Sequence, residues 1–591
     1  MIKNLNIKKF AVIILSAMCV ISCKKSSTDT GGYPPSGGGG TTNPVKIDST
    51  YSPVDPALPI TAGFFLDGFT GKIFTSVEGI TGAVPTAAPT DSLTINLNKV
   101  LAKVPTLIYG NNSNLWSGQM VTQPNLMQYI TDLSPNIIRA PAGSISDIYF
   151  FDGTDAMHAP ADAPAQILNA SGTAGAAGYW YGGNTASWTF SLDNYYKLLT
   201  QSNSTGLVTV NYGYARYGTS ANPVAAAAHL AANWVRYDKG RTKYWEIGNE
   251  TYGNWEAGYR IDLSKNKDGQ PEYVNGALYG KHVTVFVDSM KAAAKEINAT
   301  IFIGASLYQE PPYGGAYTSI QTWNQGVLTS GGTSADFYIV HNYFTAYNAN
   351  SSVADILKTS NVPSAVMKYL QQQTTAAGAA MKPVALTEWN IQAMGSKQNV
   401  SFIAGIHAAK TLGEIIKNNY GEASRWDFAN GYDNGDDMGL FNNGSESGAP
   451  LWNPRPAFYY MYYFQKYFGD RMVADSLKAA YNNSDITTYS STFTSGQAGT
   501  IIVNSGASNH IVSIDFQHFP AGSKYYWYVL TGGTDNGGFS GQVFVNGNGP
   551  ASPTGGPLNY ATIKPYSAPL AGTIKINVPS MSVIYLVADK K

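Results

Sequence analysis

Two short apolar segments of this sequence each lead to a carboxylate. Residues 244–248 are followed by Asn249 and Glu250, and residues 383–387 run directly into Glu388. Short runs rich in β-branched and aromatic residues indicate strands that are buried on both faces. Two carboxylates at the tips of two such strands are the minimal equipment for hydrolysing a glycosidic bond with retention of configuration.

That chemistry sets requirements on the pair. The carboxyl groups must stand roughly 5–5.5 Å apart, one protonated to donate to the leaving oxygen and one ionised to attack the anomeric carbon. Neighbouring carboxylates push their pKa values apart, which provides both states at one pH. We assign Glu250 as general acid/base and Glu388 as nucleophile, with Asn249 at the sugar 2-OH. A lone Glu is usually a surface or capping residue, so the assignment depends on both being present.

An alternation of strands and helices positions the two carboxylates. The predicted strands cover residues 106–109, 137–140, 207–211, 244–248, 301–305, 337–341, 384–388 and 425–428. Helical patterns lie between them, clearest at residues 223–237, 279–297, 353–373 and 400–418. Eight strands with intervening helices predict an α/β fold, a (β/α)8 barrel, with a doubly wound sheet as the alternative. No Gly-rich phosphate loop follows a strand, which disfavours the nucleotide-binding versions of that alternative.

In such a barrel the catalytic groups project from the carboxyl ends of the strands. Glu250 closes the fourth predicted strand and Glu388 the seventh. Those strands lie across the barrel mouth from one another, so the two carboxylates can face each other over one substrate.

The pattern changes after the predicted barrel, which we place at residues 101–455. Strands at 499–503, 511–516, 525–530, 542–545, 573–578 and 582–587 alternate with Gly, Asn and Ser turns, and no helix of useful length is expected. Residues 456–591 therefore predict a C-terminal antiparallel β-sandwich. Residues 46–100 contain one alternating strand at 93–97, and we expect this segment to pack on the barrel or the sandwich.

The N-terminus predicts export. Lys3, Lys8 and Lys9 precede a short apolar stretch, and Val20-Ile21-Ser22-Cys23 resembles a lipobox, with an ordinary signal peptide as the alternative. Residues 1–22 would be removed, Cys23 would carry lipid, and residues 23–45, rich in Gly, Ser, Thr and Pro, would form a flexible tether. Such a protein is anchored to a bacterial membrane on its periplasmic or cell-surface face rather than spanning it. The other cysteine, Cys19, lies in the removed segment, so no disulfide is expected.

Composition narrows the class of partner. Formal net charge is +0, which gives no basic excess for binding nucleic acid. Aromatic residues make up 13% of the chain, with 40 Tyr and 11 Trp. Aromatic side chains fill cores and also stack on the apolar faces of sugars, so this content fits either use.

Taken together, Trp245 to Glu250 and Thr387 to Asn390 resemble the clan of retaining (β/α)8 glycoside hydrolases, and most closely the α-L-arabinofuranosidase family, glycoside hydrolase family 51. Further segments carry the likeness: residues 138–143 resemble a strand-two R-x-P-G-G, residues 152–153 an acidic-Gly pair, residues 340–343 a strand-six H-x-Y, and residues 454–457 the barrel exit. The resemblance covers about residues 101–470. It implies a polysaccharide or oligosaccharide substrate, and substrate-site roles for Arg139, His341 and Tyr343.

Two departures fall on substrate contacts of that family. Asn114 stands where the family has a Glu that contacts arabinose, and Ser144 stands where it has an Asn after P-G-G. The reaction class is therefore better supported than the sugar, and an endo-acting β-glycanase remains an alternative. Among the Trp residues of the predicted mouth loops, Trp116, Trp180, Trp188, Trp255 and Trp389, we single out Trp389 because it adjoins the nucleophile.

No cofactor or metal is expected. The seven His are scattered, without H-E-x-x-H or close carboxylate partners. Two further classes compete with the hydrolase. A non-catalytic glycan-binding lipoprotein is disfavoured because both carboxylates are present, and a polysaccharide lyase is disfavoured because the site lacks the basic residues that uronates require.

Overall fold

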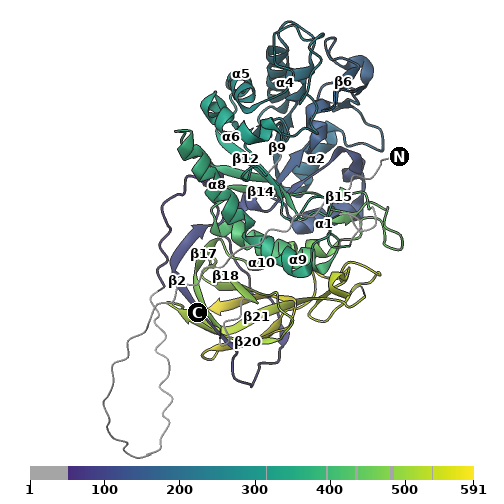
Figure 1. Cartoon of the computed structure of the whole chain (residues 1–591). Coiled ribbons are helices and arrows are strands. Elements are labelled where there is room, and N and C mark those ends of the chain that lie inside the picture. The colour runs from purple at the N-terminus through teal and green to yellow at the C-terminus, as the bar shows by residue number, and fades with distance from the viewer. Residues whose placement is uncertain (1–50, 314–315, 394–396, 433–436, 480–484, 536) are drawn as a thin grey trace, which may run out of the picture. The chain divides into compact units, whose positions relative to one another are not determined.

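The structure is a computed structural model that describes residues 51–313, 316–393, 397–432, 437–479, 485–535 and 537–591. The predicted signal segment, Cys23 and the whole of the predicted tether lie outside the described residues. Its centre is a closed barrel of eight parallel strands (Figure 1). In order around the barrel these are β3 (Gly110–Asn112), β4 (Ile137–Ala140), β9 (Thr205–Val210), β10 (Tyr244–Ile247), β11 (Phe302–Ser306), β12 (Phe337–Tyr343), β13 (Val384–Asn390) and β14 (Glu422–Arg425).

Helices follow the strands in a regular alternation, which confirms the predicted (β/α)8 fold. They are α1 (Pro124–Leu133), α2 (Leu192–Ser202), α3 (Gly213–Tyr217), α4 (Pro223–Asp238), α5 (Gly276–Glu296), α6 (Thr318–Thr329), α7 (Val353–Lys358), α8 (Val362–Ala376), α9 (Phe402–Lys417) and α10 (Pro456–Tyr467). The long helix expected at residues 353–373 is two helices, because Pro363 lacks the N–H that an uninterrupted helix needs and instead sits in the first turn of α8.

The first and last barrel strands differ from their predicted positions. Residues 106–108 form a 3-10 helix, and the strand is the Gly110-Asn111-Asn112 segment that follows. A Cβ at Gly110 would lie 2.4 Å from Oγ of Ser424, so β3 approaches β14 closely only because the residue is Gly. The eighth strand ends at Arg425 rather than beginning there. Its sequence Glu-Ala-Ser-Arg is polar although every residue is buried, and within it the hydroxyl of Ser424 donates to the carboxylate of Glu422.

The expectation of no helix after residue 456 is wrong. α10 is the eighth barrel helix, and its run of Tyr and Phe is almost wholly buried because it packs against α9 on one side and against β25 on the other. Tyr463 donates a hydrogen bond to the carbonyl of Tyr560, and Tyr585 donates one to the carbonyl of Tyr460, each 2.8 Å long. α10 therefore joins the barrel to the C-terminal β region (Figure 1).

The C-terminal β region contains one large hydrogen-bonded sheet, which wraps around its own hydrophobic core as a sandwich. Its main path runs β1 (Ile80–Thr81), β23 (Tyr566–Pro569), β21 (Ala521–Gly532), β25 (Ser582–Lys590), β19 (Ala498–Asn504), β18 (Ile486–Thr492), β17 (Arg471–Ala479), β2 (Asp91–Lys103), β20 (His510–Gln517) and β24 (Ile574–Val578), with β22 (Val543–Val545) beside β21. The sheet is mixed rather than purely antiparallel, because β2 is parallel to β20 and β1 is parallel to β23.

The segment before the barrel also closes its lower end. Phe64 and Phe65, in the 3-10 helix Gly63–Leu66, pack against Tyr244, Phe302 and Phe337 at the amino ends of three barrel strands. The rings of Phe64 and Phe302 stack with centroids 3.9 Å apart. The strand ends that carry the carboxylates are therefore at the opposite, open end of the barrel.

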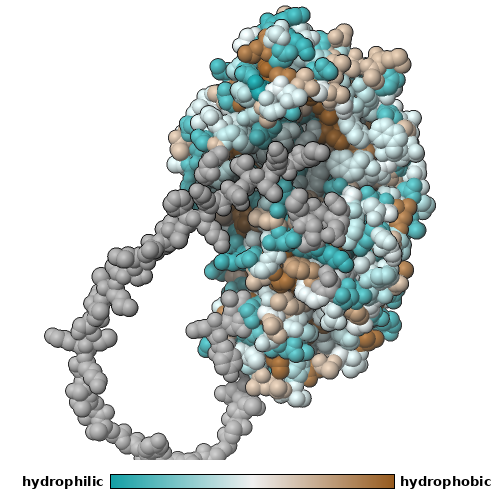
Figure 2. All heavy atoms as spheres, turned by 45° about the vertical axis from the view of Figure 1, so that its right-hand side comes forward, coloured by the Kyte–Doolittle hydropathy of each residue, from teal (hydrophilic) through white to brown (hydrophobic). Residues whose placement is uncertain are grey.

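Among the described residues, three small two-stranded sheets belong neither to the barrel nor to the large sheet. They are β5 (Tyr149–Phe150) with β8 (Trp180–Tyr181), β6 (Gln166–Leu168) with β7 (Ala174–Ala176), and β15 (Ala429–Asn430) with β16 (Phe441–Asn442). On the face shown in Figure 2, hydrophobic residues form scattered small patches in a largely hydrophilic surface. Among the described residues, no helix combines the length and apolar character needed to cross a membrane.

Candidate active site

The two predicted catalytic carboxylates line one open cavity at the carboxyl ends of the barrel strands. Glu250 follows β10 by three residues and Glu388 lies near the end of β13. The cavity has a volume of about 1320 Å³ and is lined by both, together with Asn249 and Tyr343. A cavity of this size exceeds the usual range for drug-sized ligands, about 300–1,000 Å³, so it can admit several sugar units.

His341, from β12, lies between the two carboxylates. One oxygen of Glu250, one nitrogen of His341 and one oxygen of Glu388 all lie within 4.8 Å of one another. Nδ1 of His341 is 3.2 Å from Oε1 of Glu250 and 3.6 Å from Oε1 of Glu388. Nε2 of the same ring is 2.9 Å from Oγ1 of Thr387, which fixes the plane of the imidazole.

Arg139, from β4, is the buried cation that orders the floor of the site. Its Nε donates to Glu246 at 2.6 Å, its Nη1 to Glu388 at 2.7 Å, and its Nη2 to Oδ1 of Asn249 at 2.8 Å. Burial acts to lower the pKa of Arg139, but the charges of Glu246 and Glu388 outweigh it and hold the pKa above its usual range. One guanidinium therefore fixes both Glu388 and Asn249, the residue that precedes Glu250.

The nucleophile candidate has a second firm partner. The hydroxyl of Tyr343, two residues beyond His341 on β12, donates a hydrogen bond of 2.6 Å to Oε2 of Glu388. Burial, and then the charge of Glu388, hold the pKa of Tyr343 well above its usual range, so the phenol stays protonated and remains a donor. The H-x-Y segment thus contributes both of its side chains to the carboxylate pair.

The backbone around Glu250 is strained. Glu250 has a φ of 36° and Gly248 a φ of 73°, both in the left-handed region. A Cβ at Gly248 would lie 2.7 Å from Cβ of Tyr212, so only Gly fits there. Non-glycine residues held in this region cost on the order of 1–3 kcal/mol and cluster at functional sites, which agrees with a chemical role for Glu250.

His341 sets the protonation of Glu250. Burial raises the pKa of Glu250, but the hydrogen bond and charge of His341 outweigh it, and the pKa is lowered from 4.5. Burial lowers the pKa of His341, but the charge of Glu388 and the hydrogen bond to Glu250 raise it above 6.5. The electrostatics of Glu250 therefore depend on His341, whereas the sequence argument considered only the two carboxylates.

Glu256 is a buried carboxyl group next to the site that the sequence analysis missed. Its Oε1 accepts hydrogen bonds from Nδ2 of Asn249 at 2.9 Å and from Oγ of Ser144 at 2.8 Å. Burial, and then the charges of Asp147 and Glu250, raise its pKa well above 4.5. Glu256 follows no strand, so no sequence pattern distinguished it from a surface Glu.

Asn114 and Ser144, the two departures from the family pattern, are both occupied by protein contacts. Asn114 is fully buried, and its amide donates to Asp427 and to the carbonyl of Ala429. The described residues that line the cavity do not include Asn114, whereas they do include Ser144. The first barrel strand therefore offers no direct sugar contact at the position where the family has one.

The Trp residues of the predicted mouth loops divide into two groups. Trp116 and Trp255 line the cavity, together with Trp426, which the prediction did not include. Trp389 does not line it: the side chain is only 1% exposed and stacks against Phe344 with ring centroids 6.4 Å apart. A supporting position behind Glu388 fits Trp389 better than a surface on which sugars stack.

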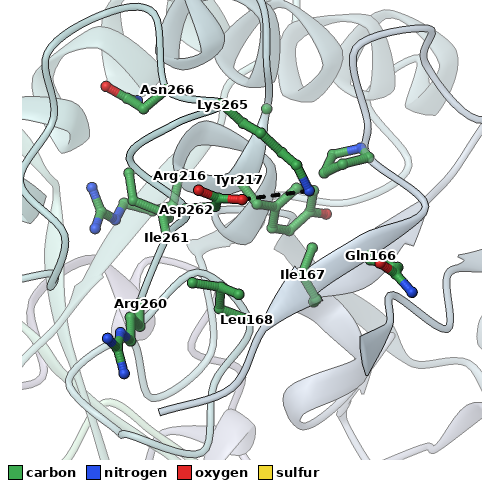
Figure 3. Close-up of a pocket in the computed structure, with 12 residues that line it drawn as sticks. Gln166, Ile167, Leu168, Arg216, Tyr217, Arg260, Ile261, Asp262, Lys265 and Asn266 are labelled. Carbon is green, nitrogen blue, oxygen red and sulfur yellow. Dashed lines mark ion pairs between the residues drawn. The ribbon is translucent and has the colours of Figure 1, made fainter. Parts of the chain in front are cut away.

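Within the described part of the chain, the atoms of Glu250, His341 and Glu388 also form the one cluster close enough to hold a cation. The guanidinium of Arg139, 2.7 Å from Glu388, places a fixed positive charge against that cluster and opposes a second cation there. A separate hollow of about 20 Å³, lined in part by Arg216 and Tyr217, contains the ion pair of Lys265 and Asp262 (Figure 3). It is too small for a sugar ring.

Comparison with known proteins gives a fold-level relation. No protein-family model and no curated protein matches the sequence. The structure of an α-L-arabinofuranosidase from Thermotoga maritima in complex with arabinose matches with a TM-score of 0.58 and 14% identity, covering 84% of this chain and 99% of that chain. A family 51 α-L-arabinofuranosidase from Bifidobacterium longum matches with a TM-score of 0.56 and 15% identity, over 85% and 100%.

Enzymes with other substrates match over the same extent. A xyloglucanase of glycoside hydrolase family 44 from Paenibacillus polymyxa has a TM-score of 0.51 and 11% identity, over 85% of this chain and 100% of that chain. At such identities the likeness concerns the fold. The chain has the barrel-and-sandwich fold of these glycoside hydrolases, and the resemblance stated from the sequence is confirmed at that level.

Proposed function

We propose that this protein is a retaining glycoside hydrolase, with Glu388 as nucleophile and Glu250 as general acid/base. The observation that carries the proposal is the pair of carboxylates at the ends of β10 and β13, with oxygens within 4.8 Å of one another. Retaining enzymes need a separation of roughly 5–5.5 Å, whereas inverting enzymes need about 6.5–9.5 Å to fit a water molecule. The short spacing supports double displacement.

In the first step a carboxylate oxygen of Glu388 attacks the anomeric carbon while the bond to the leaving oxygen breaks. Glu250 donates a proton to that oxygen, and the sugar is left as an ester of Glu388. In the second step Glu250 takes a proton from water, whose oxygen attacks the anomeric carbon and releases Glu388. The net reaction adds one water across the glycosidic bond and returns both side chains to their starting states.

His341 supplies the proton balance between these steps. The hydrogen bond between Nδ1 of His341 and Oε1 of Glu250 holds the proton that the leaving oxygen requires. When Glu388 becomes an ester it loses its negative charge, which is a main cause of the raised pKa of His341. Formation of the intermediate therefore lowers the pKa of His341, which favours release of its proton at this stage of the reaction.

For the substrate, we propose a plant or algal polysaccharide or its oligosaccharides, cleaved in an α-L-arabinofuranosidase-like reaction, with an endo-acting β-glycanase as the alternative. The fold of the family 51 enzymes supports the first reading. The cavity volume of about 1320 Å³ and the absence of Asn114 from its described lining support the second. Within the proposal, export and lipid attachment at Cys23 place the enzyme on a bacterial membrane facing its polymer.

Azide rescue tests the mechanism. Glu388→Ala and Glu250→Ala should each abolish hydrolysis of a natural glycosidic bond. Added azide should restore turnover of an activated aryl glycoside by Glu388→Ala, giving a glycosyl azide of inverted configuration, because azide occupies the space of the missing nucleophile. Full activity of Glu388→Ala without azide would refute the mechanism.

A substrate panel tests the two substrate readings. Aryl α-L-arabinofuranoside, β-xyloside, β-glucoside and β-galactoside are compared with polymeric arabinan, xylan and xyloglucan. Turnover of the arabinofuranoside with release of single sugars supports the exo-acting reading. Rapid loss of viscosity of a polymer, with mid-length products, supports the endo-acting reading.

A further inference from the structure

We propose that Trp180 and Trp188 form a second glycan-binding platform outside the cavity, on which a polysaccharide chain held at the catalytic carboxylates continues. The inference rests on the proposed function, because its ligand is the same polymer. It concerns residues that do not line the cavity.

The two indoles form a rigid, exposed pair. The side chain of Trp188 is 58% exposed, whereas Trp180 is half-buried and packs against the hydrophobic core of the barrel. Their ring centroids are 5.4 Å apart with an interplanar angle of 69°, an edge-to-face contact. Trp180 thus fixes the ring of Trp188, which presents a flat apolar face to solvent. A large aromatic side chain held in this way gives contact area at low cost in conformational entropy.

The platform adjoins the cavity through paired chain segments. The backbone N–H of Phe190 donates to the carbonyl of Leu115 at 2.9 Å, and the amide of Gln119 donates to the carbonyl of Ala186 at 2.8 Å. In the sequence, Trp188 lies between Ala186 and Phe190, and Trp116 lies between Leu115 and Gln119. Trp116 lines the cavity together with Trp426, and the ring centroids of these two residues are 6.2 Å apart. A chain leaving the cavity over Trp116 therefore meets the segment that carries Trp188.

The chemistry of this surface selects a neutral chain. Residues 163–192, which include both indoles, contain no Asp, Glu, Lys, Arg or His. The neighbours of Trp188 are Asn184, Thr185 and Ser187, which offer hydroxyl and amide groups to sugar hydroxyls. The segment itself offers uronates no cation, and Arg260, which donates to the carbonyl of Ala170, is already paired with Glu272. The ligand class is thus an uncharged polysaccharide whose sugar rings present C–H faces to the indole.

Binding is measured first without catalysis. Affinity electrophoresis of Glu388→Gln through gels containing xyloglucan, mixed-linkage β-glucan, xylan or arabinan should show retardation by at least one polymer. Adding Trp188→Ala should weaken that association roughly three- to tenfold, the effect of losing one aromatic contact. The matched control is Tyr273→Ala in the same background, because Tyr273 is an exposed aromatic residue that lines neither the cavity nor the platform.

Hydrolysis then separates the platform from the catalytic site. In the otherwise wild-type enzyme, Trp188→Ala should raise KM for the polymer by a similar factor and leave turnover of a small aryl glycoside unchanged. The inference would be overturned if Trp188→Ala and the double variant Trp180→Ala/Trp188→Ala both kept the gel retardation and the polymer KM of the protein with both Trp residues. A change in oligomeric state without a change in glycan binding would also overturn it, by assigning the indoles to a protein interface.

Failure of the proposed function gives a different result. If wild-type protein hydrolyses no glycoside but its retardation depends on Trp188, the platform stands and the hydrolase does not. If hydrolysis of the polymer is normal in every Trp variant, the hydrolase stands and the platform does not.

Discussion

The two carboxylates of the proposed catalytic pair are held in different ways. Both oxygens of Glu388 have firm donors, Arg139 at 2.7 Å and Tyr343 at 2.6 Å, and its side chain is only 4% exposed within a barrel strand. Glu250 lies on a loop with a strained backbone, and its side chain is 17% exposed. Its donors are the indole of Trp255 at 2.9 Å, itself 54% exposed, the shared His341, and the hydroxyl of Tyr252 at 3.4 Å.

The difference matches what each group has to do. A nucleophile must stay ionised and meet one carbon atom at one angle, so fixed donors on both oxygens serve it. An acid/base must give up a proton, accept another from water and tolerate both states. For that purpose a partly exposed loop position with an imidazole beside it is better than fixed donors on both oxygens. The comparison predicts that substitutions on the Glu388 side cost more than those on the Glu250 side.

The largest contrast is expected between the two Gln variants. Glu388→Gln should lower kcat at least about 10⁴-fold on every substrate, because no first step is possible without the nucleophile. Glu250→Gln should lower it by about 10²–10⁴-fold on natural glycosides but far less on an aryl glycoside whose leaving group needs no proton. Steady-state kinetics on a series of aryl glycosides checks this. Equal losses on the best and worst leaving groups in Glu250→Gln would contradict its role as acid.

Loss of Arg139 should damage folding as well as activity. Arg139→Met leaves Glu246 and Glu388 without their buried cation, and breaking a buried ion pair costs about 3–5 kcal/mol. The matched control is Arg236→Met, whose pair with Glu296 at 2.6 Å is solvent-exposed, and which should cost no more than about 1 kcal/mol. Chemical denaturation measures both. Similar losses of unfolding free energy in the two variants would show that the ion pairs of Arg139 with Glu246 and Glu388 do not stabilise the barrel more than an exposed pair does.

The sequence predicted the barrel because most of its strands are apolar and short enough to distinguish from helices. The exceptions are β3 and β14. In β3, Gly110 allows close approach to Ser424, and in β14 the buried residues Glu422 and Ser424 are polar, so neither strand shows the apolar pattern. α10 was missed because its Tyr-rich run has the composition of a strand. Its helical period is hidden because every side of it is buried between two layers.

The meeting of Glu250 and Glu388 at one end of the barrel was predictable because each lies at a strand end, and strand order places the two strands across the barrel mouth. Arg139, His341 and Tyr343, which bond to these carboxylates, were also named from the sequence. Glu256 and Trp426 were not, because they reach the site through loops that no local pattern describes. Asn114 shows the opposite case. The sequence marked it as a changed substrate contact, and the structure places it in a buried hydrogen bond with Asp427 instead.

His341→Gln should move the pH dependence of the acid. His341 lowers the pKa of Glu250, so its removal leaves burial to raise that pKa, and the protonated acid persists to higher pH. The pKa of Glu250, followed from the NMR resonance of its carboxyl carbon, should therefore rise, and kcat/KM should fall on the order of tenfold or more because the proton held between the two side chains is lost. Tyr343→Phe is the control, because it removes a donor to Glu388 and should lower kcat without raising the pKa of Glu250. A pKa of Glu250 that stays or falls in His341→Gln would refute the coupling.

The smallest effect is expected at Glu256, behind the acid/base. Its raised pKa means that it folds as a neutral acid, so its stabilising contribution is complete below the ordinary pKa of Glu and is lost as pH rises through the folded-state value. Glu256→Gln keeps an acceptor for Asn249 and Ser144 but cannot ionise. It should hold activity within a few-fold and lose less stability than wild type between acidic and alkaline pH.

Unfolding midpoints across that pH range measure the effect, with Glu296→Gln as control. Hydrogen bonding to Arg236 lowers the pKa of Glu296, so the contribution of this exposed residue is small and has the opposite dependence on pH. If wild type and Glu256→Gln lose stability in parallel as pH rises, Glu256 is already ionised. The loop that carries Glu250 would then hold a second negative charge, that of Glu256, close to the proposed acid/base.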